Sequence, residues 1–294
     1  MKTYTNCPIC EAKNFTPFLT CDDNTGSDER FNIAKCTNCN FAFTNPIPLE
    51  SEIGKYYESD DYISHSNTSK GLVNFLYQKV RNYTLDKKVS LLQRISNNRN
   101  LLDIGCGTGE FLARAKQHGF SVKGIEPSES AKLQAIKNFQ LTVEGEKHLA
   151  ELASESFDFI TMWHVLEHVF HLNERIVDLK RLIKKDGSII IAVPNLQSYD
   201  AKKYKKHWAA YDVPRHLYHF SEKDIKKLAL KHGLQMTQTL PMKFDSFYVS
   251  MLSEKYKTGN QNLLAAFFTG LKSNIVANSS GGYSSQIYVL KSAN

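Results

Sequence analysis

The fold is decided by one stretch near the middle of the chain, Leu101-Leu102-Asp103-Ile104-Gly105-Cys106-Gly107-Thr108-Gly109-Glu110-Phe111. Its first residues have the apolar character of a buried strand, and its three glycines allow a tight turn that brings the backbone close to a ligand. An amphipathic helix is expected next, ending at Gly119. A second short strand, 122–125, leads to Glu126, 21 residues beyond Gly105. A carboxylate at that point can accept both hydroxyls of a ribose, so the pattern predicts a nucleoside-bearing cofactor.

Two acidic side chains distinguish between the cofactors that use this arrangement. Dinucleotide-binding folds have the motif G-x-G-x-x-G, and this chain has Glu110 at its last position. Asp103, just before the glycines, would repel a pyrophosphate but attract a cationic sulfonium and an amino group. These residues favour S-adenosylmethionine over a dinucleotide.

The stretch from Leu102 to Gly109 resembles the first motif of class I S-adenosylmethionine-dependent methyltransferases. Residues 157–160 and 166–169, Phe-Asp-Phe-Ile and Leu-Glu-His-Val, resemble the fourth-strand motif of the same family. The resemblance covers residues 98–240. It implies a doubly wound, mostly parallel seven-stranded sheet with a last antiparallel strand, and S-adenosylhomocysteine as the product.

The sequence after Glu126 continues as alternating helices and strands. Helices are expected over 128–138 and 172–185, the second closed by Asp186-Gly187, and strands over 141–143, 157–162, 188–193, 234–239 and 286–290. Ligands of such α/β sheets bind beyond the carboxyl ends of the strands. The cofactor is therefore expected to contact residues that follow three strands: Asp103, Gly105, Cys106, Gly107, Thr108, Gly109, Glu126, Pro127, Trp163 and His164.

Four cysteines form a separate pattern at the amino end. Cys7 and Cys10 make one C-x-x-C pair, and Cys36 and Cys39 make a second, with 25 residues between the pairs. This spacing is typical of a four-thiolate tetrahedral site that holds a structural zinc ion between two tight turns of a β ribbon. Cys21 and Cys106 are left unpaired.

These patterns divide the chain into three parts. Residues 1–48 are expected to be a zinc-ribbon-like β module, and 49–97 a helical linker or cap with a flexible polar link from Ser64 to Lys70. Residues 98–294 are expected to form the methyltransferase domain. Within it, 244–276 is too long for a hairpin loop and is expected to form helices over 247–255 and 263–271, which act as a lid.

Methyl transfer to a hydroxyl or an amine requires an in-line approach and the removal of a proton. Histidine is the natural base near neutral pH. Candidates cluster just past the expected fifth strand, where His216 and His219 fit the role and Arg215 could bind an acidic group of the acceptor. A structural, hydrogen-bonded role stays open for each histidine.

Composition limits the choice of partners. The 294 residues are 41% hydrophobic and 23% charged, with no apolar run near the roughly 20 residues that span a bilayer. The amino end lacks the apolar core of a signal peptide, so the cytoplasm is expected. The net charge of +7 includes a lysine run at 202–206. Because aromatic side chains do not alternate with these lysines, nucleic acid is not expected as a partner.

The leading hypothesis is a methyltransferase acting on a small molecule such as a sugar, a lipid precursor or a quinone-like metabolite. One alternative is an RNA or protein methyltransferase that holds its substrate with the zinc ribbon. Another is a non-catalytic protein that only binds S-adenosylmethionine. The sequence leaves the acceptor and the oligomeric state open, because fold and cofactor do not determine the substrate.

Overall fold

A computed structural model of the chain describes residues 1–27, 29–57 and 72–293, and the side chains of 72–77 are not included. The expected link from Ser64 to Lys70 lies outside the described residues. The centre of the molecule is a seven-stranded sheet with the order β10-β11-β8-β7-β4-β5-β6. All neighbouring pairs from β8 to β6 are parallel, and β11 is antiparallel to both β10 and β8. The predicted fold class is confirmed.

The bounds of the sheet strands are β4 Asn100–Ile104, β5 Ser121–Ile125, β6 Val143–Glu144, β7 Phe157–Trp163, β8 Ile183–Pro194, β10 Leu234–Pro241 and β11 Ser285–Ser292. The longer helices are α2 Leu72–Ile95, α3 Glu110–Gln117, α4 Glu129–Phe139, α5 Leu172–Leu182, α6 Tyr199–Tyr204, α7 Glu222–Lys231, α8 Asp245–Thr258 and α9 Leu263–Ser280. Short 3₁₀ turns are η1 Ile53–Tyr57, η2 Glu146–Glu151, η3 Leu166–His168, η4 Lys205–His207 and η5 Ala209–Tyr211.

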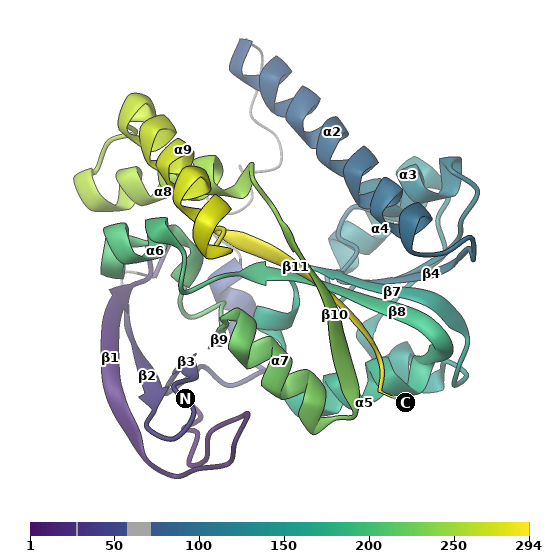
Figure 1. The fold of residues 1–294 in the computed structure, drawn as a ribbon, viewed down its shortest axis with the longest axis horizontal. Coiled ribbons are helices and arrows are strands. Elements are labelled where there is room, and N and C mark those ends of the chain that lie inside the picture. The colour runs from purple at the N-terminus through teal and green to yellow at the C-terminus, as the bar shows by residue number, and fades with distance from the viewer. Residues whose placement is uncertain (28, 58–71, 294) are drawn as a thin grey trace.

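Helices cover both faces of the sheet, because successive residues of a strand point to opposite sides. Leu101 packs into a buried cluster with α2, α3 and α4, whereas Leu102 packs into a second cluster with α5 and α7. Figure 1 shows α2, α3 and α4 on one side of the sheet and α5 and α7 on the other. The buried apolar run from Ile189 to Val193 in β8 is the consequence.

The junction between α5 and β8 differs from the prediction. The helix was expected to run to Lys185, but α5 ends at Leu182 and β8 begins at Ile183. Ile183 is a register partner of Phe157 on β7 and is buried in the core, so the sheet takes residues whose local pattern favours a helix. The predicted helix end at Asp186-Gly187 is therefore wrong.

A four-stranded sheet with the order β1-β2-β3-β9 forms the amino-terminal part, next to α6 and α7 (Figure 1). Its first three strands are β1 Phe15–Asp22, β2 Arg30–Cys36 and β3 Ala42–Thr44, and the fourth is β9, Tyr218–His219. Phe41 and Phe43 belong to the same buried cluster as Leu217 and Phe220. The amino-terminal strands thus share a core with the segment that follows α6.

Both helices expected between β10 and β11 are present. They are longer than predicted, as α8 and α9, and pack against each other as a hairpin at the edge of the molecule (Figure 1). In the described part of the chain, no helix has the length and apolarity needed to cross a membrane.

Candidate cofactor and acceptor site

The glycine turn after β4 has the conformation that the sequence predicts. Gly105, Gly107 and Gly109 have φ values of +70°, +56° and +87°, in the region that favours glycine. A Cβ atom on Gly105 would lie 2.5 Å from Cγ2 of Val165. Glycine therefore lets the first turn approach the segment that follows β7.

Glu126 closes this turn from β5. Its Oε2 accepts a hydrogen bond of 2.7 Å from the Gly107 amide, and its Oε1 accepts one of 2.9 Å from the Ser128 amide. A carboxylate has about four acceptor positions, so two remain for ribose hydroxyls. Pro127 is exposed between Glu126 and the start of α4, whereas Cys106 is buried and Thr108 is half-buried. The candidate residues of β4 and β5 thus gather at adjacent strand ends.

Asp103 is buried beneath the turn. Its Oδ1 accepts a hydrogen bond of 2.5 Å from the Thr161 hydroxyl of β7. Burial raises the pKa of Asp103 to about 7, against the opposing effects of Thr161 and the nearby Lys88 ammonium. A cationic ligand would therefore find a carboxyl group that ionises near neutral pH.

Glu110 pairs with Arg81 of α2 and accepts a hydrogen bond of 2.7 Å from Thr108, which lies between Gly107 and Gly109. The acid that distinguishes this turn from a dinucleotide motif thus helps to fasten α2 to the start of α3.

Trp163 and His164 lie at the carboxyl end of β7. The indole Nε1 of Trp163 is buried and has no hydrogen-bond partner among the described residues. The Lys88 Nζ lies 4.2 Å from the centre of the ring. Because buried indole N–H groups normally have a partner, Trp163 is suited to contact a bound ligand.

His164 is held between two carboxylates in a left-handed backbone conformation, with φ of +56°. Its Nε2 lies 3.0 Å from Oδ2 of Asp245 at the start of α8, and its Nδ1 lies 3.4 Å from Oε1 of Glu167. Burial alone would lower the pKa of His164, but the two carboxylates raise it to about 10. His164 is therefore a cation at neutral pH.

Beyond His164 lies a second group of titratable side chains. One atom each of Glu167, His168 and His216 lie within 4.8 Å of one another. Glu167 is fully buried, and neither carboxylate oxygen has a hydrogen bond among the described residues apart from the His164 ion pair. Carboxylate and imidazole groups at this spacing could also hold a divalent cation.

Backbone carbonyls define the protonation of the two histidine rings. Nδ1 of His216 lies 2.9 Å from the Ala210 carbonyl oxygen, and Nδ1 of His168 lies 3.1 Å from that of Arg215. A carbonyl only accepts, so each neutral ring has its proton on Nδ1 and its lone pair on Nε2. The Nε2 of His216 lies 3.8 Å from Oδ2 of Asp212. Burial, and then the neighbouring His216 side chain, lower the pKa of His168 to about 4, which keeps the His168 ring neutral.

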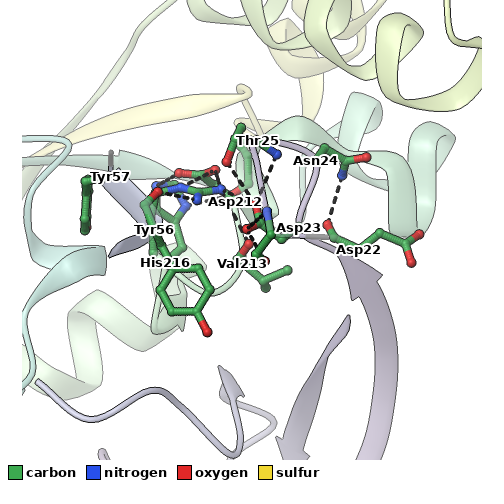
Figure 2. Close-up of polar contacts among 12 residues, drawn as sticks. Asp22, Asp23, Asn24, Thr25, Tyr56, Tyr57, Asp212, Val213 and His216 are labelled. Carbon is green, nitrogen blue, oxygen red and sulfur yellow. Dashed lines mark hydrogen bonds and ion pairs between the residues drawn. The ribbon is translucent and has the colours of Figure 1, made fainter. Parts of the chain in front are cut away.

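The other two residues from the predicted acceptor segment lie elsewhere. His219 is on β9, buried against Tyr211, and its Nε2 is 3.1 Å from the Thr44 hydroxyl. Arg215 is completely buried and bonds to Asp23, Asp212 and the Tyr56 carbonyl. The expectation that Arg215 could bind an acidic acceptor is wrong, because its donors are used inside the protein. Figure 2 shows Asp23, Asp212, Tyr56 and His216 gathered at this point.

Comparison with known proteins agrees with this geometry. A family model described as a methyltransferase domain matches residues 77–239, more than half of the chain. The chain belongs to the methyltransferase-domain family. It is an S-adenosylmethionine-dependent methyltransferase, as the glycine turn and its two acids predict.

Curated relatives and solved structures agree with this membership. The methyltransferase is 25% identical over 234 residues to a ubiquinone biosynthesis O-methyltransferase of Rickettsia bellii, an alignment that covers 74% of the chain and 95% of the relative. It is 31% identical over 163 residues to the protein of that name from Pelagibacter ubique, covering 51% and 68%. The fold is similar to magnesium protoporphyrin IX methyltransferase of Synechocystis PCC 6803 with bound SAH. That match has a TM-score of 0.56 and 18% identity, and covers 84% of this chain and all of that one.

Three residues of the site were not assigned a role from the sequence. Lys88 and Asp245 come from α2 and α8, outside the strands and turns that carry the motifs, and no local pattern marks them. Glu167 was within the fourth-strand motif, but only the fold shows that its carboxylate is buried beside His164 and His216.

Proposed function

We propose that the protein transfers the methyl group of S-adenosylmethionine to a hydroxyl of a small molecule, such as a sugar, a lipid precursor or a quinone-like metabolite. The observation that carries this proposal is the spatial arrangement of side chains from the glycine turn through His164 to His216. In this arrangement, a site suited to a cationic nucleoside lies next to buried histidines that can act as bases. The O-methyltransferase names of the curated relatives support a hydroxyl acceptor.

The residues fit the cofactor in charge and in space. Asp103 would face the sulfonium and amino groups of the cofactor, and Glu126 would accept hydrogen bonds from its ribose. Trp163 would pack beside the cofactor. Gly107, which has open space around its Cβ position, would allow close approach. When bound, S-adenosylmethionine supplies an electrophilic methyl group. We assign Gly105, Cys106, Thr108, Gly109, Pro127 and His164 to the same binding region.

His216 is the residue that we propose as the base. Its Nε2 would take the proton of the acceptor hydroxyl as the oxygen attacks the methyl carbon. The Ala210 carbonyl holds the ring in the required tautomer, and Glu167 would stabilise the imidazolium that forms. His219 stays a second candidate from the sequence, with its Nε2 already near Thr44.

The function is tested by two measurements on the full chain. Titration calorimetry with S-adenosylmethionine and with NAD should show binding of the first alone. Incubation with methyl-labelled cofactor and fractionated metabolites should then label one small-molecule fraction. A protein that binds the cofactor but labels nothing would be a binding protein, and label in RNA or protein alone would contradict the small-molecule acceptor.

Cofactor affinity should depend on pH through Asp103. Because its pKa is about 7 and a cation binds the ionised carboxylate, affinity should fall as the pH drops. We expect the dissociation constant for S-adenosylmethionine to rise about 10-fold between pH 8 and pH 6. The variant D103N should bind weakly at both values and lose this dependence. A wild-type constant that is flat from pH 6 to pH 8 would contradict the assignment.

We also propose that residues 1–48 hold a structural zinc ion through Cys7, Cys10, Cys36 and Cys39. The Sγ atoms of Cys7 and Cys39 are 3.6 Å apart, and those of Cys10 and Cys36 are 3.5 Å apart. Zinc with bonds of about 2.3 Å holds its four sulfurs about 3.8 Å apart, close to these spacings. Burial raises the pKa of Cys7 to about 11, so a cation is needed to keep its sulfur as a thiolate.

Metal analysis tests this zinc assignment. The purified protein should contain about one zinc per chain, and C36S should lose most of it, because three thiolates bind zinc far more weakly than four. C21S is the matched control, since Cys21 is buried but outside the cluster. Wild-type protein without zinc, or C36S with unchanged zinc, would contradict the assignment.

A further inference from the structure

Thr44 of β3 contacts the segment that carries His216. Its side chain is fully buried, and its Oγ1 donates a hydrogen bond of 2.8 Å to the main-chain carbonyl oxygen of His216. The same Oγ1 lies 3.1 Å from Nε2 of His219. The Thr44 amide donates a bond of 2.9 Å to the Leu217 carbonyl oxygen. One residue of the amino-terminal sheet thus bonds to three residues that follow it by 172 to 175 positions.

The hydroxyl of Thr44 can make these bonds in one direction only. A hydroxyl has one proton and a carbonyl oxygen only accepts, so the proton of Thr44 lies on the bond to His216. Its oxygen then accepts a hydrogen bond from Nε2 of His219. Burial, and next the neighbouring His216 side chain, hold the pKa of His219 well below its usual range, so this ring is neutral. Nε2 of His219 is therefore a donor, whereas Nε2 of His216 has a lone pair.

A single peptide group joins Thr44 to the segment that follows β7. The carbonyl of His216 and the amide of Leu217 belong to one planar trans unit, in which they point in opposite directions. The carbonyl accepts from Thr44, and the amide donates a bond of 2.8 Å to the Glu167 carbonyl oxygen. Glu167 also contributes its carboxylate to the cluster with His216. This peptide group is therefore held between β3 and η3, next to the Cα atom that carries the His216 ring.

The pairing of β3 with β9 does not by itself hold His216. The ladder joins residues 42–43 to residues 218–219, so it ends before His216. Among the described residues, the Thr44 hydroxyl is the donor to the His216 carbonyl. Without this hydroxyl, a buried carbonyl would lack a partner, which folded proteins rarely allow. Its loss should therefore move the main chain of His216 while the ladder stays in place.

We propose that Thr44 is a positioning residue for methyl transfer, whose hydroxyl holds the main chain of His216 where its ring can reach the acceptor. The inference rests on the proposed function, because it takes His216 as the base. A displacement of about 1 Å can lower a rate about 10²-fold, so one hydrogen bond outside the reaction can matter. The amino-terminal sheet, whose β3 lies beside β9 in Figure 1, then forms part of the proposed acceptor side of the site.

The variant T44V tests this role, since valine has nearly the shape of threonine but no hydroxyl. We expect kcat, measured by single turnover into the metabolite fraction that the wild type labels, to fall about 10–100-fold. The dissociation constant for S-adenosylmethionine should change little, because the cofactor residues follow β4, β5 and β7. T44S keeps the hydroxyl and should recover most of the loss. The matched control is T269V, because Thr269 is buried and its hydroxyl donates to the Ala265 carbonyl, but it lies on α9.

A double-mutant cycle separates positioning of the base from a general effect on the fold. Adding T44V to H216Q should lower kcat little further, because no base is left to position. An equal loss in both backgrounds, or a loss that T44S does not recover, would overturn the proposal. Loss of activity in H216Q with full activity in T44V would overturn the positioning role alone. Full activity in H216Q would overturn the base assignment and the positioning role together.

Magnetic resonance of the histidine rings tests the same hydrogen bond without an acceptor. Proton–nitrogen correlation spectra, assigned with H216Q and H219Q, should show the ring proton on Nδ1 of His216 and on Nε2 of His219 in the wild type. T44V should shift the signals of both rings, and T44S should shift them much less. Signals of the His216 ring that T44V leaves unchanged would overturn the proposal, even where no acceptor is labelled. If T44V is too unstable to bind S-adenosylmethionine, T44A provides the same comparisons.

Discussion

We expect H216Q to lower the rate constant for methyl transfer, kcat, by about 10²–10⁴-fold, the usual contribution of a positioned base. The Nε2 lone pair of His216 is the group that would accept the proton, and glutamine has no base at that position. The dissociation constant for S-adenosylmethionine should change little, because His216 lies beyond His164, on the proposed acceptor side of the site. Single-turnover kinetics with labelled cofactor measure the first quantity, and calorimetry measures the second.

The matched variant is H219Q. His219 was also predicted as the base, and its Nε2 lies against the Thr44 hydroxyl, so we expect a much smaller loss of kcat. The pH profile separates a base from a structural residue: H216Q should remove the fall of kcat at low pH, where a base becomes protonated, whereas H219Q should keep it. Full activity in H216Q together with a large loss in H219Q would assign the base to His219.

Replacing Arg215 with methionine should destabilise the protein by about 3–5 kcal/mol, because it leaves a buried charge without a partner. The Nη2 of Arg215 lies 2.9 Å from Oδ1 of Asp23, and both side chains are only 1% exposed. Burial alone would raise the pKa of Asp23, but the Ser27 hydroxyl and the Arg215 charge hold it below its usual range. Urea unfolding measures the loss.

The exposed ion pair between Arg30 and Asp22 is a matched control for the buried pair of Arg215 and Asp23. Arg30 lies 3.0 Å from Asp22, but the Arg30 side chain is 76% exposed, so R30M should cost only about 0–1 kcal/mol. Because the pKa of Asp23 is lowered in the folded state, the contribution of its carboxylate is present above about pH 4 and is lost in acid. The difference between wild type and R215M should therefore narrow as the pH falls below about 4. Equal losses in R215M and R30M would contradict this account.

Much of the cofactor side was predictable from local sequence. The glycine turn, its two flanking acids and the apolar strands are close in the chain, and parallel strands necessarily bring Gly105, Glu126 and Trp163 to one edge of a sheet. The acceptor side was less predictable. Arg215 and His219 have the same local context as His216, yet only His216 lies with Glu167 and His168.

Tertiary packing explains that difference. Asp23 and Tyr56, which come from the amino-terminal part, bind the guanidinium of Arg215, and pairing of β9 with β3 places His219 against Thr44. No spacing rule connects residues about 190 positions apart, as Asp23 and Arg215 are. The same holds for Asp245, which lies 81 positions after His164 in the sequence and whose carboxylate keeps the His164 ring protonated.

By itself, the sequence determined the α/β class, the positions of the main strands along the chain, the glycine turn and the class of cofactor. These depend on local periodicity and on residues close together in the chain. The tertiary structure alone decided which histidine joins Glu167 and that Arg215 is an internal ion-pair partner. Those features depend on contacts between distant segments, where burial and charge pairing determine which way a side chain faces.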